Sequence, residues 1–199
     1  IPVTASVQVL TPMYKGPVGV TTLNTELQAM LNPASPDKTE IKLGYKTFRE
    51  ADRVMQLKND YENEVFNGDQ GRIVGIDTEE SQLFVEFDGR EVMFEAMETD
   101  QLVLSYACTI HKSQGREFPV AIIPVTTSQY IMLQRNLLYT AITRAKQMCF
   151  LLGEKKALGI SIKNNKPVCR YTTLESLLRD SETLHGKRRK TASKPRRRS

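Results

Sequence analysis

The sequence contains no tryptophan and has only three cysteines and two histidines among its 199 residues. The cysteines are widely separated and form no C-x-x-C pair, so the sequence indicates neither a zinc site nor a disulfide framework. With two histidines, a histidine-rich metal centre is not expected either. The unpaired cysteines favour a reducing, cytoplasmic setting.

Two further absences limit the possible functions. No apolar run approaches the length that spans a bilayer and no secretory signal opens the chain, so we expect no membrane partner. The phosphate-binding loop G-x-x-x-x-G-K-[ST] is missing, and so is an Asp-Glu pair at the end of an apolar strand. The chain alone is therefore not expected to hydrolyse ATP. It begins with Ile1 rather than methionine, and we expect it to be a piece of a longer protein.

The positive charge is confined to one end of the chain. The formal net charge is +5, but the thirteen residues from Lys187 onward hold eight Lys or Arg and no acid. The rest of the chain holds 20 Lys or Arg against 23 Asp or Glu, a balance of −3. Residues 181–199 are therefore predicted to be a disordered basic tail. Two interpretations stay open: the tail strengthens electrostatic binding to a phosphate backbone, or it only aids solubility.

The first part of the chain has an α/β pattern. Residues 7–11 alternate apolar and polar side chains and are predicted to form a short strand that ends at Pro12. Apolar residues recur at helical spacing over residues 20–31, and the Asn-Pro pair that follows is predicted to end this helix. Residues 33–40 are predicted to be a polar linker.

From about Phe48 to Leu104 the pattern changes to short strands. The predicted strands are residues 54–57, 72–77, 83–87 and 91–94, and Asp88-Gly89 is a strong hairpin signal. Several short strands with tight turns and no helix are typical of a small closed barrel.

After Leu104 the α/β pattern returns. Residues 120–125 form an uninterrupted apolar run, which is typical of a strand covered on both faces. Residues 134–146 are predicted to be a helix, 148–152 a second buried strand, and 158–162 and 174–178 short helices. Each α/β piece is too short to form a domain alone, so we expect the two to pack together.

Two segments carry most of the candidate chemistry. Residues 106–118, YACTIHKSQGREF, place five hydrogen-bonding side chains within six positions, and Gly115 lets the backbone approach a ligand or turn sharply. This pattern suits phosphate or nucleic-acid contact, and a polar loop with a capped helical turn accounts for it equally well. The five side chains are Thr109, His111, Lys112, Ser113 and Gln114.

The second segment is residues 135–146, RNLLYTAITRAK. On a helical wheel, one face is apolar and the other carries Asn136, Thr140, Thr143 and Arg144. Arg144 would then be held beside two hydroxyls, and a guanidinium suits a phosphoryl group because it is always charged and carries a fork of donors. An amphipathic helix with a solvated arginine is the plainer alternative. The apolar face consists of Leu137, Leu138, Ala141, Ile142 and Ala145.

These segments resemble the motifs of one helicase family. HKSQGREF (111–118) is similar to motif V of superfamily-1 helicases, LYTAITRA (138–145) is similar to motif VI, and VLTPMYKG (9–16) resembles motif IV of the RecD-like branch. DRVMQLKNDY (52–61) and EVFNGD (64–69) resemble the entry to the SH3-like barrel that this branch inserts in its second motor domain. Four motifs in family order identify the chain as the C-terminal motor segment of a RecD-like DNA helicase.

The resemblance implies an α/β fold, a RecA-like motor domain of P-loop NTPase type with an inserted small SH3-like β-barrel. Residues 1–47 and 105–180 would form the two parts of the motor domain, and residues 48–104 would form the barrel. Residues 181–199 would be the basic tail.

The resemblance also implies roles for single residues. Arg144 would be the catalytic arginine finger that reaches the γ-phosphate across the cleft between motor domains, a role worth about 10³–10⁵ in rate. Glu117 resembles the acid that contacts the nucleotide ribose, and Gln114 and Gly115 lie where motif V meets the nucleotide. Lys15 stands where motif IV often supplies a second arginine near the phosphates.

The remaining predicted contacts are to DNA. Thr109, His111, Lys112 and Ser113 resemble the motif V face toward single-stranded DNA. Barrel loops of this family lie along the DNA path, where stacking and phosphate contacts build sequence-neutral binding. The predicted barrel contacts are Lys58, Asn59 and Tyr61, whereas Asn67 is interpreted as a turn residue and Tyr139 as a packing residue.

By the same resemblance, the parent protein is an ATP-dependent helicase of the bacterial cytoplasm, active in DNA repair or recombination. It would use ATP and Mg²⁺ to move 5′ to 3′ along single-stranded DNA, as a monomer, with its N-terminal motor domain as the partner of this segment. The segment alone is expected to hold no cofactor. Two alternatives stay open: a non-enzymatic DNA-binding module, or the helicase part of a conjugative relaxase or a recombination nuclease complex.

Overall fold

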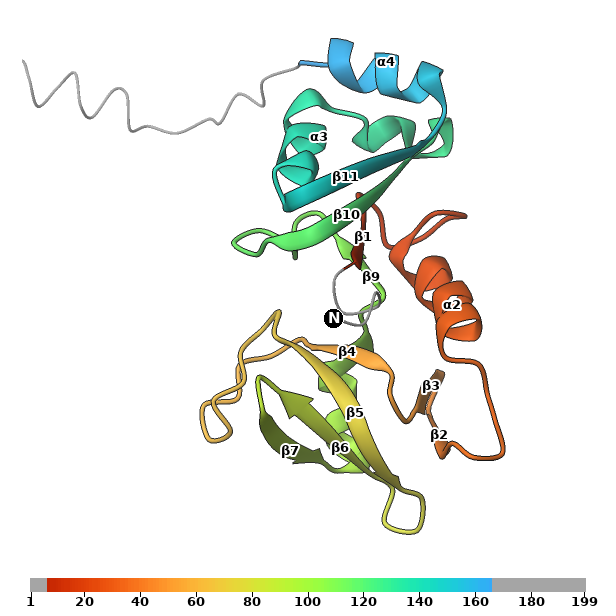
Figure 1. Ribbon diagram of the computed structural model, residues 1–199, viewed down its shortest axis with the longest axis vertical. Helices are drawn as coiled ribbons and strands as arrows, with labels where there is room; N and C mark the ends of the chain where they lie inside the picture. The colour runs from red at the N-terminus through yellow and green to blue at the C-terminus, as the bar shows by residue number, and fades with distance from the viewer. Residues whose placement is uncertain (1–6, 166–199) are drawn as a thin grey trace, which may run out of the picture. The chain divides into compact units, whose positions relative to one another are not determined.

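The computed structural model describes residues 7–165, and Figure 1 shows the arrangement of their helices and strands. Strands and helices alternate near both ends of this range, and short strands fill its middle. The elements are β1 (Val7–Thr11), α2 (Val20–Leu31), β2 (Glu40–Leu43), β3 (Lys46–Arg49), β4 (Arg53–Gln56), β5 (Gln70–Asp77), β6 (Gln82–Phe87), β7 (Arg90–Phe94), the 3-10 helix η1 (Ala96–Gln101), β8 (Leu102–Leu104), β9 (Ala107–Thr109), β10 (Phe118–Val125), the 3-10 helix η2 (Thr127–Met132), α3 (Arg135–Ile142), β11 (Ala145–Gly153) and α4 (Lys155–Lys163).

Some predictions fall outside this range. The helix predicted at residues 174–178 and the basic tail predicted at residues 181–199 lie outside the described residues. Among residues 7–165, no helix combines the length and apolar character needed to cross a membrane. Within the same residues, no group of three or more His, Cys, Asp or Glu side chains is placed to hold a metal ion.

Four parallel strands form one sheet, in the order β11-β10-β1-β9. β1 lies between strands from the far end of the described chain, because Val9 is the partner of Ile122 in β10 and of Ala107 in β9. The prediction that the segments before and after the barrel pack together is therefore confirmed. This sheet is called the parallel sheet below.

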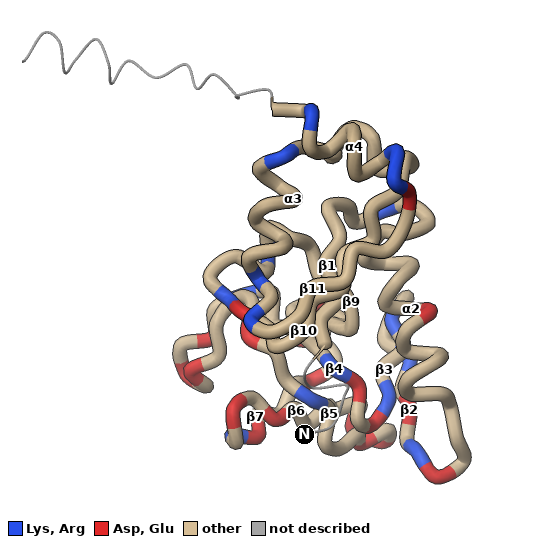
Figure 2. Tube along the Cα trace, turned by 45° about the horizontal axis from the view of Figure 1, so that its top comes forward, with Lys and Arg blue, Asp and Glu red and all other residues tan. Residues whose placement is uncertain are grey.

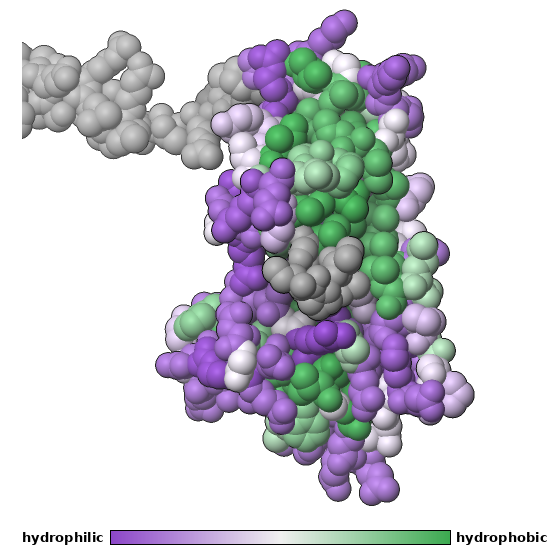
Figure 3. Space-filling view, in the orientation of Figure 1, coloured by the Kyte–Doolittle hydropathy of each residue, from purple (hydrophilic) through white to green (hydrophobic). Residues whose placement is uncertain are grey.

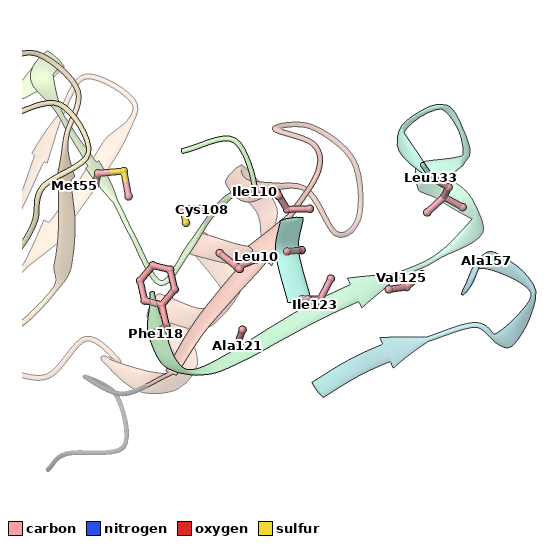
Figure 4. Packing of buried hydrophobic residues seen from close by; sticks show 11 residues of the cluster. Leu10, Met55, Cys108, Ile110, Phe118, Ala121, Ile123, Val125, Leu133 and Ala157 are labelled. Atoms are coloured by element: carbon pink, nitrogen blue, oxygen red, sulfur yellow. The ribbon is translucent and has the colours of Figure 1, made fainter. Parts of the chain in front are cut away.

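One face of the parallel sheet carries a buried core. Alternate residues of a strand point to opposite faces, so every second residue of β10 contributes to this core. Ala121, Ile123 and Val125 of β10 are at most 4% exposed and pack with Leu10 of β1. Figure 4 shows these side chains on neighbouring strands, together with Leu133. Helices α3 and α4 contribute buried alanines to the same cluster, so they cover this face.

The opposite face of the parallel sheet is less buried than the sequence predicts. Residues 148–152 do belong to a strand, β11, but the prediction that it is buried is wrong: Met148, Phe150 and Leu152 are 52%, 45% and 55% exposed. β10 is buried on alternate residues only, so coverage of both its faces is also wrong for the described chain. The physical reason is that the described helices α3 and α4 both pack on the other face, so neither covers the exposed side chains of β11. Figure 3 shows hydrophobic residues gathered on the surface in the region of β10 and β11.

The middle of the chain forms a second, antiparallel sheet in the order β7-β6-β5-β4-β8, called the barrel below. The predicted hairpin is confirmed: Asp88 and Gly89 join β6 to β7 with φ angles of 48° and 82°. Closure is not made by backbone pairing, because among the described strands no ladder joins β7 to β8. The 3-10 helix η1 connects them, so the expected absence of helix is wrong at this point. The buried core of the barrel comprises Phe48, Val54, Val65, Ile73, Leu83, Val85, Phe87, Val92, Phe94 and Leu102.

The entry and exit strands of the barrel lie side by side, because Val54 of β4 is the antiparallel partner of Leu104 of β8. Beside this junction, helix α2 has the predicted bounds but buries a polar face, while its apolar Met30 is 75% exposed. The physical reason is a buried carboxylate: Asp52 accepts hydrogen bonds from Gln28 at 2.5 Å and from Asn32 at 2.7 Å. Tyr106 also donates to Asp52 from the segment before β9, at 2.8 Å.

Candidate functional site

Arg144 lies between the end of helix α3 and the start of strand β11. The helix is shorter than predicted: it ends at Ile142, Thr143 caps it, and Ala145 already belongs to β11. The prediction that Arg144 lies on the helix is therefore wrong. The chain leaves the helix because the carbonyl of Arg144 accepts the Phe118 N–H of β10 at 2.8 Å and so begins the pairing of β10 with β11.

The guanidinium of Arg144 is held mainly by backbone oxygens. Its Nη1 donates to the carbonyl of Arg116 at 3.1 Å, and its Nε donates to the carbonyl of Thr140 at 3.3 Å. Its Nη2 donates to the hydroxyl of Thr143 at 3.4 Å, so one hydroxyl contacts it rather than the predicted two. A guanidinium has more N–H donors than these three contacts use, so Arg144 can bind a further anionic acceptor without giving them up.

Glu117 lies next to Arg144 in the structure. Residue 117 immediately precedes β10 and residue 144 immediately precedes β11, and these two strands pair from their first residues. The Glu117 carboxylate is exposed and forms an ion pair with Lys146 at 3.3 Å. Gln114 and Gly115 are exposed in the same connection, and Gly115 has a φ of +82°, a conformation that favours glycine. The structure thus brings together four of the five predicted nucleotide-binding residues.

Lys15 is the exception. It follows the C-terminal end of β1, whereas Glu117 and Arg144 precede the N-terminal ends of β10 and β11. Because these strands are all parallel, the two positions belong to opposite edges of the sheet. Lys15 is exposed and shares its edge with Thr109, whose strand partner is Thr11 at the end of β1.

The predicted DNA-contacting turn after β9 has two inward and two outward side chains. Ser113 is 0% exposed and its hydroxyl donates to the Ile110 carbonyl at 2.7 Å, while Thr109 accepts the Lys112 N–H at 3.1 Å. These two side chains fix the turn. His111 is exposed and Lys112 half-buried, so they are the members of the predicted set that face outward.

Lys112 and Thr109 also line a cavity of about 420 Å³. Helix α2, the β2–β3 hairpin and strands β4, β8 and β9 contribute to its wall, which is largely apolar with threonine, asparagine and lysine groups among the lining residues. Burial lowers the pKa of Lys112 below its ordinary value. Tyr14, which is 54% exposed, lines the same cavity, so the loop after β1 and the turn after β9 meet here.

The predicted DNA contacts of the barrel lie in one loop, residues 57–69, called the barrel loop below. Tyr61 is 76% exposed and meets Phe66 edge to face, with ring centroids 6.0 Å apart. Asn59 donates a hydrogen bond to the Tyr61 hydroxyl and accepts one from the Asn67 N–H, so it stabilises the loop. Asn67 lies in the turn, as interpreted from the sequence. Lys58 pairs with Asp100 at 3.1 Å.

The charge of the barrel loop is mainly negative. It holds four acids and one lysine, and Figure 2 shows acidic positions on its trace between β4 and β5. Repulsion between these carboxylates and a phosphate backbone makes the aromatic pair, rather than ionic contact, the feature of this loop that fits a nucleic acid.

Two family models match the chain. The SH3 domain of ATP-dependent RecD-like DNA helicases matches residues 23–87, and the UvrD-like helicase C-terminal domain matches residues 104–152. Over 86% of the chain, 38% of residues are identical to the ATP-dependent RecD2 DNA helicase of Deinococcus radiodurans. The chain belongs to the RecD-like helicases. The family resemblance read from motifs IV, V and VI is thereby confirmed.

This RecD-like chain spans about a quarter of the length of the curated relatives that it matches. It covers 23% of the Deinococcus radiodurans protein and 25% of the RecBCD enzyme subunit RecD of Haemophilus influenzae, with which it is 27% identical over 88% of its own length.

Solved structures of Pif1 helicases share the fold of this RecD-like chain. Bacteroides Pif1 in complex with ADP-AlF3 and single-stranded DNA superposes with a TM-score of 0.55 at 19% identity, over 88% of this chain and 45% of that one. A structure of two coordinating Pif1 helicases at forked DNA gives the same TM-score at 20% identity, over 91% and 45%. The α/β fold class, a RecA-like motor domain with an SH3-like barrel, is confirmed.

Three residues of this RecD-like chain were not found by sequence reasoning. Phe66 packs edge to face against Tyr61 at the exposed end of the barrel loop, and the EVFNGD match could have singled it out as an aromatic. Asp69 forms an ion pair with Arg116 at 2.5 Å. No sequence signal could have paired them, because 47 positions separate them along the chain.

Proposed function

We propose that this chain is the C-terminal motor segment of an ATP-dependent DNA helicase and that Arg144 is its arginine finger. One observation carries the proposal: the guanidinium is fixed by the carbonyls of Arg116 and Thr140 yet keeps donors for another acceptor. A positively charged group in a fixed place stabilises the charge that develops on a transferring phosphoryl group without reorganising during the reaction.

The neighbours of Arg144 fit a nucleotide at this edge of the sheet. Glu117 offers an exposed carboxylate that can accept hydrogen bonds from ribose hydroxyls. Gln114 and Gly115 present an amide side chain and an unobstructed stretch of backbone in the same connection. We assign these three residues to nucleotide binding, and we move Lys15 from that group to the DNA side because it belongs to the other edge.

On the DNA side, His111, Lys112 and Lys15 supply the outward polar groups of the parallel sheet. Thr109 and Ser113 hold the turn that presents them. The barrel loop would add base stacking through Tyr61, with Asn59 bracing it and Lys58 at its base. Single-stranded DNA is the proposed ligand because stacking surfaces and separated cations suit unpaired bases on a flexible backbone.

The rest of the machinery belongs to the parent protein in this proposal. Its N-terminal motor domain would carry the phosphate-binding loop and the acid that holds Mg²⁺, so this segment contributes to ATP binding only across the cleft. The parent would act as a monomer in the bacterial cytoplasm and unwind duplex DNA by moving 5′ to 3′ on one strand. Repair, recombination and conjugation are the settings in which such motors act.

The test is hydrolysis of ATP by the full-length parent, stimulated by oligo(dT), with wild-type protein compared with Arg144→Ala. We expect kcat to fall by about 10³-fold or more because the transition state loses a fixed positive charge. Binding of fluorescent oligo(dT), measured by anisotropy in the absence of nucleotide, should change by less than about threefold, a difference of about 0.6 kcal/mol.

Arg135→Ala is the matched control. Arg135 is an exposed arginine at the start of the same helix, and its Nε donates to the Ile162 carbonyl rather than toward the Arg116 carbonyl. Its kcat should stay within about twofold of wild type, as is usual for surface substitutions. A parent that hydrolyses ATP at the wild-type rate without Arg144 would favour the non-enzymatic DNA-binding module instead.

A further inference from the structure

Arg116 connects the arginine finger to the barrel through two different groups. Its backbone carbonyl accepts the Arg144 Nη1 at 3.1 Å. Its side chain extends the other way, and its Nη2 donates to Asp69 Oδ1 at 2.5 Å. One residue therefore touches the proposed catalytic guanidinium at one end and the barrel loop at the other.

The backbone at Arg116 depends on this side-chain tie. Residues 116 and 117 belong to no helix or strand, and Gly115 before them has a positive φ of +82°. The hydrogen bond from the Arg116 N–H to the Ser113 carbonyl at 3.1 Å fixes one side of the residue. The ion pair with Asp69 fixes the other, so the position of the Arg116 carbonyl follows from both.

Asp69 is in turn part of the barrel loop's aromatic end. Its Oδ2 accepts the Phe66 N–H at 2.8 Å, and its own N–H donates to the Phe66 carbonyl at 2.9 Å. Phe66 packs against the exposed Tyr61, the proposed stacking residue. A shift of the aromatic pair on binding a base would therefore act directly on the carboxylate that holds Arg116.

The environment makes this ion pair more than a surface contact. The Arg116 and Asp69 side chains are 31% and 32% exposed, whereas the barrel pair Arg90–Glu64 is 50% and 71% exposed. Charges that are partly shielded from water interact more strongly and are screened less by salt. The Asp69–Arg116 pair is thus the better candidate to transmit a change between the two parts.

We infer that Asp69 and Arg116 are positioning residues that couple DNA contact at the barrel loop to the placement of Arg144. Single-stranded DNA on Tyr61 and Phe66 would set Asp69, Asp69 would set Arg116, and the Arg116 carbonyl would set the guanidinium for ATP. This inference rests on the proposed function, and it names how DNA stimulates hydrolysis at that site. Coupling between two ligands requires an element whose position both of them bias, and this pair is such an element.

The test uses the full-length parent with Asp69→Asn, Arg116→Gln and the double variant. ATP hydrolysis is measured with and without saturating oligo(dT), together with the KM for ATP and the thermal unfolding midpoint. We expect each single variant to lower the stimulation of kcat by oligo(dT) about 5- to 20-fold, within the range typical of coupling between sites. Asp69→Asn keeps an oxygen for the Phe66 N–H, so it removes the charge and leaves the loop's own bond.

The double variant separates positioning from simple damage. If the two residues act only through each other, the double variant loses no more stimulation than the more affected single variant. Arg116→Lys, which keeps the charge but not the fork, should recover part of the loss. Arg90→Gln, which breaks the more exposed ion pair between Arg90 and Glu64, should keep wild-type stimulation and serves as the control.

Two outcomes would overturn the inference: single variants with wild-type stimulation, or losses that multiply in the double variant. Arg144→Ala in the same assay keeps this test apart from the proposed function. Loss of hydrolysis in Arg144→Ala with unaffected Asp69 and Arg116 variants overturns the coupling alone. Wild-type hydrolysis in Arg144→Ala overturns the proposed function and the coupling with it.

Discussion

The barrel and the parallel sheet differ in how completely they bury their apolar side chains. The barrel core residues are at most 5% exposed, and all of them come from the continuous stretch of chain between β3 and β8. The parallel sheet buries Leu10 and Ile123 on one face but leaves Phe150 and Leu152 of β11 about half exposed on the other. The barrel thus completes its core within residues 7–165, whereas the sheet completes only one of its two layers there.

This difference shows which part of the molecule needs a further covering layer for its stability. An apolar sheet face is stable when a second layer covers it. A barrel with a full core needs no such layer. The stability of the barrel should therefore be a property of the described residues, and that of β11 should depend on what is added to them.

Phe48→Ala should have the largest effect on stability. Phe48 is 0% exposed in the barrel core, and removing a buried phenylalanine side chain costs about 3–5 kcal/mol through lost burial and the cavity left behind. Urea unfolding of the 199-residue chain, followed by far-ultraviolet circular dichroism, measures this loss. A cost below about 1 kcal/mol would mean that Phe48 is not buried as described, since surface substitutions lie in that range.

The two described cysteines offer a chemical comparison of the two outer strands of the parallel sheet, since Cys108 lies on β9 and Cys149 on β11. Cys108 is 4% exposed, and burial raises its pKa to about 12; burial also raises the pKa of the half-buried Cys149. Because only the thiolate reacts, a raised pKa keeps Cys108 protonated and slow to alkylate until the pH approaches 12. In a Cys169→Ser background, iodoacetamide at pH 8 should modify Cys149 about tenfold faster than Cys108, as mass spectrometry of the native protein would show.

Equal alkylation rates would mean that β9 opens as readily as β11.

The raised pKa of Cys108 also predicts how the free energy of unfolding changes with pH. The folded state holds the Cys108 proton more tightly than the unfolded chain, whose thiol has an ordinary pKa of 9.0. The contribution of Cys108 to stability is therefore present below pH 9 and is lost as the pH rises from there toward about 12.

Phe150→Ala should have the smallest effect on the free energy of unfolding. Phe150 is 45% exposed, so its removal from the 199-residue chain should cost about 1 kcal/mol or less in the same urea experiment. Phe48→Ala is its matched counterpart, with the same substitution in the other region. A cost for Phe150→Ala equal to that for Phe48→Ala would show that residues beyond the described range cover β11.

The sequence predicted local features well and distant ones poorly. Alternation and turn residues located β1, β5, β6, β7 and the Asp88-Gly89 hairpin, because these depend on neighbours along the chain. The apolar run in β11 did not show which of its faces would be covered, since that depends on another layer. The polar face of α2 was hidden for a similar reason: it depends on Asp52, about twenty positions beyond Asn32.

The candidate site divides in the same way. Motif V and motif VI gave Glu117 and Arg144 from short patterns, and the paired starts of β10 and β11 bring them together. Lys15 was grouped with them by motif order, and only the direction of the strands separates it. No sequence pattern predicts the pairing of Asp69 with Arg116, because an ion pair between a barrel loop and a distant turn produces no periodicity in the sequence.

The pairing of β4 with β8 has a consequence for how the chain folds. About a hundred residues separate β1 from its neighbours β9 and β10, and a loop of that length would slow their meeting. Because Val54 and Leu104 are partners, a folded barrel holds its first and last strands together. Once the barrel has formed, only the segments between β1 and β4 and between β8 and β10 remain as free connection, about half of the original length, which lowers the entropic cost of closure by about 0.6 kcal/mol. An insertion more than fifty residues long thus shortens the path between the parts of the sheet that it interrupts.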